Sequence, residues 1–119
     1  MNDVLQFFSH SLPKKFRDRA ESKSAWESRY SDSVWPQVEH FLLLFCDAFL
    51  LRRTGLPRLY PDDKLTEINN EMFRFWPVDE LQFPHFQKAL RREYGVEILM
   101  KDFEGQTLGD LFDKVRHAS

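Results

Sequence analysis

The chain has 119 residues, of which 42% are hydrophobic and 15% aromatic, so it is long enough to bury a core as one domain without metals or disulfides. Charged residues make up 30% and nearly balance at a formal net charge of −2, which argues against a dedicated nucleic-acid-binding protein because such proteins carry a strong basic excess. The single cysteine, Cys46, excludes an internal disulfide and is interpreted as a small buried hydrophobe within an apolar run.

Residues 1–33 are predicted to form an N-terminal extension with one or two short helices. This segment holds all but the last of the chain's serines and only sparse apolar residues after its first cluster. Phe16 and Trp26 are among those sparse positions, and we expect the extension to dock mainly through its aromatic residues. Ser24 followed by Glu27 fits a capping box, although this pattern is common by chance.

A first long helix is predicted over residues 34–53. Asp32 or Ser33 offers an N-cap, and Gly55 followed by Pro57 ends the helix. Its interior is apolar on nearly every side, so it needs a cover on more than one face. The extension can supply that cover, and so can a second copy of the protein, which leaves homodimerisation open.

Residues 56–80 are predicted to form a long, irregular connection. Three prolines and a pair of adjacent asparagines interrupt this segment, which also carries many large apolar side chains. We therefore expect a loop that packs down on the helices rather than a flexible linker.

A second helix is predicted to begin near Phe83. If Asp79 were its N-cap, Pro84 would lie beyond the first turn and would remove a hydrogen bond. Gly95 is a natural residue to end this helix. Its predicted buried face consists of residues at helical spacing: Phe86, Ala89, Leu90 and Tyr94.

The remaining elements are short. Residues 96–98 are predicted to form an extended link, and residues 101–104 a single helical turn. Thr107 then caps a last helix through Asp110, in a weaker form of the capping box. The apolar stripe of that helix follows in helical steps: Leu108, Leu111, Phe112 and Val115.

The stretch DELQFPHFQKALRREYGVEILMKDFEGQTLGDLFDKV, residues 79–115, carries a family resemblance. Its Asp-x-Leu opening, its acidic-aromatic-Gly turn before Val-Glu-Ile and its Thr-x-x-Asp helix start resemble the acyl carrier protein family. The chain looks most like the uncharacterised bacterial acyl-carrier-like proteins. The resemblance reaches the first helix only by position and length and does not cover residues 1–33. It implies an all-α fold, a small acyl-carrier-protein-like helical bundle over residues 34–119 with a helical N-terminal extension.

Glu80 departs from this family at the position that matters most. Acyl carriers bear phosphopantetheine on the serine of Asp-Ser-Leu, whereas this chain reads Asp-Glu-Leu, and a carboxylate cannot form that phosphodiester. No serine occurs between Ser33 and Ser119 to replace it. Glu80 could mimic a phosphoserine, but an exposed glutamate favoured by the helix dipole is the commoner case. The resemblance therefore implies a protein without the phosphopantetheine cofactor.

The charge of the second helix is a further departure. Acyl carriers dock on partner enzymes through an acidic second helix, by electrostatic complementarity. The matching helix here carries basic and neutral polar residues, and these are the candidate partner-binding residues: Gln82, His85, Lys88, Arg91 and Arg92. The competing interpretation is an ordinary solvated helix face.

The residues offer no catalytic, metal or phosphate-binding pattern. The four histidines are scattered without metal-ligand spacing, and the four glycines do not cluster into a phosphate-binding loop. No nucleophile, base and orienting group can be assembled from these positions. We therefore expect neither an enzyme nor a metal site nor a cofactor.

A cytoplasmic location is expected. The first residues carry an acid early and lysines late, the reverse of a secretory signal. The longest apolar stretch, residues 41–51, is interrupted by Asp47 and is too short to span a bilayer. Neither a membrane nor a nucleic acid is therefore an expected partner.

The leading hypothesis is a non-catalytic, acyl-carrier-like protein–protein interaction module. It binds an acidic or apolar partner through its second helix and the aromatic stretch before it, which contains Phe73, Phe75 and Trp76. The alternative is an acyl carrier or acyl-binding protein of lipid or polyketide metabolism. Such a protein would work by a non-standard attachment, for which Cys46 is the only thiol, or by noncovalent capture.

Overall fold

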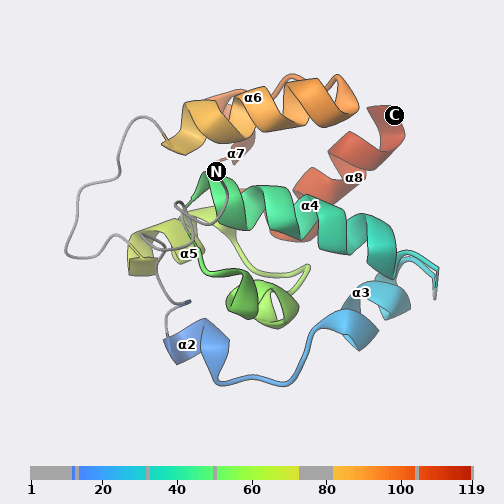
Figure 1. Cartoon of the computed structure of the whole chain (residues 1–119), viewed down its shortest axis with the longest axis vertical. Coiled ribbons are helices and arrows are strands. Elements are labelled where there is room, and N and C mark those ends of the chain that lie inside the picture. Colours follow the sequence, from blue (N-terminus) through green and yellow to red (C-terminus); the bar gives the residue numbers. More distant parts are fainter. Residues whose placement is uncertain are drawn as a thin grey trace. The chain divides into compact units, whose positions relative to one another are not determined.

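The computed structural model describes residues 12, 14–31, 33–49, 51–72, 82–103 and 105–118. Within these ranges every regular element is a helix, so the all-α prediction is confirmed (Figure 1). The elements in chain order are α2 (Lys14–Arg17), α3 (Lys23–Arg29), α4 (Trp35–Ala48), the 3₁₀ helix η1 (Arg53–Arg58), α5 (Leu65–Met72), α6 (Gln82–Tyr94), α7 (Met100–Phe103) and α8 (Leu108–Ala118). None of these helices is long and apolar enough to cross a membrane.

The chain divides into two compact units, Met1–Tyr60 and Pro61–Ser119. In the first unit, α3 packs against α4, and α2 and α4 each pack against η1. In the second unit, α6 packs against α8. The predicted division into an extension over residues 1–33 and a bundle over residues 34–119 stays a prediction.

The first predicted helix is present as α4, which carries much of the core of the first unit. Its buried residues recur with the spacing of one helix face: Val38, Phe41, Leu42, Phe45 and Cys46. Leu43 and Leu44 lie beside this face and are half-buried. The long apolar run therefore gives α4 fully or partly buried side chains on more than one side.

The predicted end of this helix at Arg53 is wrong, because α4 ends five residues earlier. The Leu51 amide donates to the Cys46 carbonyl at 2.8 Å, a hydrogen bond typical of a closing helix end. Arg52 is then extended, and Arg53 makes two hydrogen bonds of 3.1 and 3.0 Å to the Asp47 carboxylate. These contacts turn the chain where the apolar run alone would continue the helix.

The start of α4 lies within one residue of the prediction, but the expected side-chain cap does not form. Val34 occupies the N-cap position, and no side chain makes a cap hydrogen bond there. The Ser33 hydroxyl lies 3.2 Å from that of Ser31 instead, and Asp32 lies outside the described residues. Pro36 falls in the first turn, where its missing N–H breaks no helical hydrogen bond.

Gly55 and Pro57 lie inside η1 rather than ending the first helix. A Cβ atom at Gly55 would lie 3.1 Å from the Cβ of Leu12, tighter than ordinary packing. Leu12 is itself buried. Glycine therefore allows the backbone of η1 to approach this side chain closely.

Residues 14–30, here called the strap, are joined to the chain at the end of η1 by hydrogen bonds to consecutive carbonyl groups. The carbonyls of residues 57–59 accept donors from the Ser22 amide, the Arg19 guanidinium and the Trp26 indole. The donor–acceptor distances are 2.7 Å for Ser22 and 2.9 Å for Trp26. The strap thus satisfies carbonyl groups that would otherwise need water.

Aromatic side chains complete this attachment. Phe16 and Trp26 are buried, at 3% and 0% exposed. The Arg19 guanidinium lies 4.4 Å from the ring centroid of Tyr60 and 5.2 Å from that of Phe16, within the range of cation–π attraction. The Tyr60 hydroxyl donates to the Ala20 carbonyl at 2.6 Å. The expectation of short helices that dock through aromatic residues is therefore confirmed for the strap within the first unit.

The capping box predicted from Ser24 and Glu27 is wrong, because α3 begins at Lys23 and places Ser24 inside the helix. Ser22 occupies the N-cap position, with no side-chain cap hydrogen bond. Its hydroxyl is buried and meets no hydrogen-bond partner among the described residues. The strap is therefore held by its backbone, its aromatic rings and Arg19 rather than by a helix cap.

The irregular connection predicted over residues 56–80 is wrong in its first part, where the end of η1 and the whole of α5 form. Leu65 and Ile68 are buried and lie one turn apart on α5. The prolines and asparagines nearby indicated a loop, but this apolar pair provides a helix face. Residues 73–80, with the aromatic stretch and Glu80, lie outside the described residues.

The start of α5 is joined to the start of α8. Backbone hydrogen bonds of 2.8–3.0 Å connect residues 61–65 with residues 106–109. The predicted capping box of α8 is confirmed, because the Asp110 amide donates to Thr107 Oγ1 at 3.1 Å and the Thr107 amide donates to Asp110 Oδ2 at 3.2 Å. The predicted stripe of α8 is buried: Leu108, Leu111, Phe112 and Val115.

The second predicted helix is present as α6, which begins one residue before Phe83. Gly95 ends it with a φ of +67°, and its amide donates to the Arg91 carbonyl at 2.9 Å, as predicted for a C-terminal glycine. The link over residues 96–98 contains no helix, and α7 forms the single turn expected after it.

Candidate functional site

The water-facing side of α6 carries four of the predicted partner-binding residues, which are all exposed and are called the basic face: His85, Lys88, Arg91 and Arg92. The opposite side of the helix is buried through Phe83, Phe86 and Leu90. Gln82 begins α6, but its side chain lies outside the description. The helix thus brings the predicted residues onto one surface, and their role in binding stays a prediction.

The charges of the basic face are only weakly engaged within the chain. Arg91 pairs with Glu97, and Arg92 Nε lies 3.5 Å from Glu93 Oε1. Exposed pairs of this kind contribute about 0–1 kcal/mol. Lys88 makes no ion pair or hydrogen bond with any residue of the described ranges. The face therefore offers positive charge to an external ligand.

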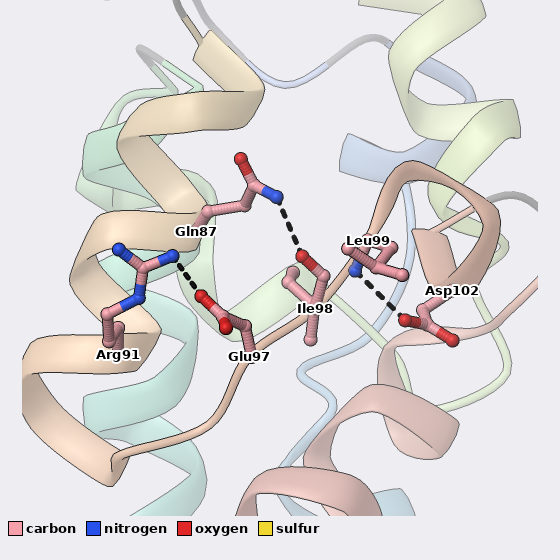
Figure 2. A network of polar contacts seen from close by, with 6 residues as sticks. All are labelled: Gln87, Arg91, Glu97, Ile98, Leu99 and Asp102. Carbon is pink, nitrogen blue, oxygen red and sulfur yellow. Dashed lines mark hydrogen bonds and ion pairs between the residues drawn. The ribbon is translucent and has the colours of Figure 1, made fainter.

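The link after α6, residues 95–99, runs back along the helix. Figure 2 shows the Gln87 amide donating to the Ile98 carbonyl, at 2.7 Å, and Arg91 paired with Glu97. Two successive residues of the link, Glu97 and Ile98, therefore contact successively earlier turns of α6. Side chains alternate along it, since Val96 and Ile98 are buried whereas Glu97 is exposed. One side of the link thus completes the core, and the other extends the surface beside the basic face.

Asp102 fixes the end of this link. Its carboxylate accepts a hydrogen bond from the Leu99 amide at 2.9 Å (Figure 2). The same carboxylate lies 3.3 Å from the ammonium group of Lys114. The hydrogen bond from Leu99 is the main cause that holds the pKa of Asp102 below its usual value, and Lys114 adds to it. The link is therefore anchored to α7 and, through Lys114, to α8.

Leu99 is an exposed large hydrophobic residue, and sequence reasoning missed it. Its side chain is 50% exposed, whereas the other large apolar side chains in the described core are covered. The alternation of Val96 and Ile98 toward the core, continued by one residue, places Leu99 on the solvent side. That alternation is the signal in the sequence that indicates an exposed Leu99.

Cys46, the thiol of the alternative hypothesis, is fully buried in α4. Burial raises the pKa of its thiol to about 12, and the neighbouring Asp47 adds to this shift. Because the thiolate is the nucleophile, a thiol with so high a pKa is nearly inert at neutral pH. This confirms the interpretation of Cys46 as a buried hydrophobe.

Metal-binding side chains do not gather in the part of the chain that the structure describes. No group of three or more His, Cys, Asp or Glu residues is placed there to hold an ion. The position of Glu80 relative to α6 lies outside the described residues. The candidate site therefore consists of the basic face and the link beside it.

No family model, curated protein or solved structure matches this chain. The resemblance to acyl carrier proteins thus rests on residues 79–115 alone and stays a prediction.

Proposed function

We propose that this chain is a non-catalytic protein–protein interaction module with an acyl-carrier-like order of helices, and that it binds an acidic partner protein through the basic face of α6. The observation that carries this proposal is the separation of the two sides of the helix. Phe86 and Leu90 anchor α6 in the core, while Lys88, Arg91 and Arg92 are exposed. A partner can therefore engage the charges without disturbing the packing.

Electrostatic complementarity supplies the mechanism. Exposed cations steer an oppositely charged surface into contact and raise the association rate more than the final affinity. The field of these charges decays over about 8 Å at physiological salt. We therefore expect binding to be fast and reversible, and to weaken as salt is added.

The acyl-carrier-like part of the proposal is supported by the order of the last three helices. α6 is followed by a non-helical link, the single turn α7 and the capped helix α8. Glu80 stands where carriers have their serine, and a carboxylate cannot accept the prosthetic arm. The proposed module accordingly retains a carrier-like helix order and works without phosphopantetheine.

Coexpression with a carrier-modifying transferase tests the absence of the prosthetic arm. Intact-mass measurement should find the unmodified mass, and a gain equal to phosphopantetheine anywhere on the chain would refute the proposal. Labelling of native protein with a thiol reagent tests the alternative attachment at Cys46. Slow labelling that becomes fast only on unfolding is expected, whereas rapid labelling of the folded chain favours a carrier.

A short fluorescent peptide of glutamates tests the binding surface itself. The wild-type chain should raise its anisotropy at low salt, and added salt should reverse the effect. The matched peptide of glutamines should not bind. Equal binding of both peptides would contradict recognition by charge.

A further inference from the structure

On the premise that the proposed function holds, the link beside α6 indicates the chemistry of the partner segment more closely. We propose that the partner segment is acidic with one large apolar side chain, which covers Leu99 while its carboxylates pair with Lys88 and Arg91. We further infer that Glu97 competes with the partner for Arg91. The surface thus binds an acidic–apolar peptide and contains its own weak competitor.

A carboxylate already occupies Arg91 within the molecule. Glu97 reaches this guanidinium from the link, and both side chains are well exposed, at 65% and 62%. The pair shows that the guanidinium can bind a carboxylate without any rearrangement of α6. Because the pair is open to water, an incoming carboxylate can replace Glu97 one for one. The seated carboxylate is the reason to favour an acidic peptide over a phosphate-bearing ligand.

Leu99 lies on the side of the link that faces solvent, with Glu97. The contacts from Glu97 to Arg91 and from Ile98 to Gln87 set the direction of the link along α6 (Figure 2). Leu99 is the next residue after Ile98 and lies two residues beyond Glu97, the partner of Arg91. An exposed apolar side chain thus follows, on the same side of the link, the carboxylate that pairs with the basic face.

Leu99 is held in place before any partner arrives. The Leu99 amide donates to the Asp102 carboxylate (Figure 2). This carboxylate in turn pairs with Lys114. A fixed residue loses little freedom on binding, which favours affinity. A partner's apolar side chain that covers Leu99 removes apolar surface from water, which favours binding.

Two copies of this chain are a poorer occupant than an acidic peptide. A symmetric pairing through this surface would place Lys88 and Arg91 of one copy near the same cations of the other. Like charges in contact are costly. Binding to anionic vesicles and to single-stranded DNA is compared with peptide binding in the test below.

Fluorescence anisotropy tests the inference with a short labelled peptide of glutamates around one central leucine. Relative to wild type, L99S should weaken binding by about 5-fold, and only while the peptide carries its leucine. E97Q should tighten binding by about 2- to 5-fold, because an exposed competing ion pair is removed. In an R91Q background, E97Q should lose this effect.

E39Q is the matched control for E97Q, because it removes one negative charge from an exposed residue of α4 and frees neither Arg91 nor Arg92, whose partners are Glu97 and Glu93. Equal tightening by E39Q and E97Q would assign the effect to net charge and overturn the role of Glu97. An unchanged affinity in L99S would overturn the apolar contact. Tighter binding to vesicles of anionic lipid or to single-stranded DNA than to the peptide would overturn the choice of partner.

K88E separates failure of this inference from failure of the proposed function. If K88E weakens peptide binding while L99S and E97Q leave it unchanged, the basic face binds acid and only the inference falls. If the wild-type chain does not bind the peptide, the proposed function falls with it. Circular dichroism and a thermal melt of each variant confirm that the fold is intact.

Discussion

The strap of the first unit and the basic face of the second use cations in opposite ways. In the strap, the Arg19 guanidinium lies against Tyr60 and donates to carbonyls of Phe16 and Arg58. On α6, the Lys88 side chain points to water and the Arg91 pair is open to solvent. One cation completes the internal hydrogen bonding of its unit, and the others remain available at the surface.

This difference separates stability from binding. Changes in the strap remove internal partners of backbone carbonyls and should therefore lower the free energy of unfolding. Changes on the basic face remove nothing that the core needs, so they should affect binding alone. Stability measurements on both regions test this contrast.

Replacement of Trp26 should have the largest effect. W26A removes a fully buried ring and leaves the Leu59 carbonyl without its donor, so we expect a loss of about 3–5 kcal/mol in the free energy of unfolding. W26F keeps an aromatic ring and should lose much less. Urea denaturation followed by circular dichroism measures both. A loss in W26A no larger than that in K88A would contradict the contrast between the two regions.

Replacement of Arg19 should have an intermediate effect. R19A removes a cation–π contact and charge-assisted hydrogen bonds to carbonyls, so a loss of about 1–3 kcal/mol is expected. R17A is the matched control, because Arg17 lies two residues earlier on the strap and is exposed. Thermal melts of the two variants compare them directly. If the two variants melt alike, Arg19 does not hold the strap.

Replacement of Thr107 should have a smaller effect. T107A removes the side-chain acceptor for the Asp110 amide at the start of α8, which typically costs about 1 kcal/mol. T107S keeps the hydroxyl and should retain most of the stability. Chemical denaturation measures this difference, and equal losses in both variants would assign it to the lost methyl group instead.

Asp102 should make the stability of the folded chain depend slightly on pH in the acidic range. Its pKa is lowered in the folded chain from 3.8, so its contribution is present above the unfolded pKa and is lost as the pH falls through the folded pKa. D102N should lack this part of the acid response. Melting temperatures of wild type and D102N, compared from neutral pH to about pH 3, measure it. Parallel curves would show that the Leu99 and Lys114 contacts do not act in solution.

Local signals in the sequence predicted the part of the second unit from α6 to α8 well, whereas α5 was predicted as an irregular connection. Pro84 fixed the start of α6 to within a residue, Gly95 fixed its end, and Thr107 with Asp110 formed the expected capping box. Each of these signals acts between residues at most four positions apart. The exposure of Leu99 also follows a local alternation, which continues one residue beyond the link predicted over residues 96–98.

The first unit was harder to predict because its boundaries depend on distant residues. The end of α4 is set by contacts of Leu51 and Arg53 that fold back on the helix, and an apolar run gives no sign of them. The carbonyls of residues 57–59 find donors more than thirty positions earlier. Hydrogen bonds between residues so far apart in the sequence cannot be predicted from the spacing of residue types. No sequence pattern marks Arg19 as a residue that joins the two segments.

Charge reversal on α6 is the decisive test of binding through the basic face. The variant K88E/R91E/R92E and the control R17E/K23E/K64E change the net charge equally, and all six residues are exposed. The association rate with the glutamate peptide should fall strongly in the first variant and much less in the control, while both keep the wild-type circular dichroism spectrum. An equal fall in both variants would mean that net charge alone attracts the peptide and that the basic face is not a binding site.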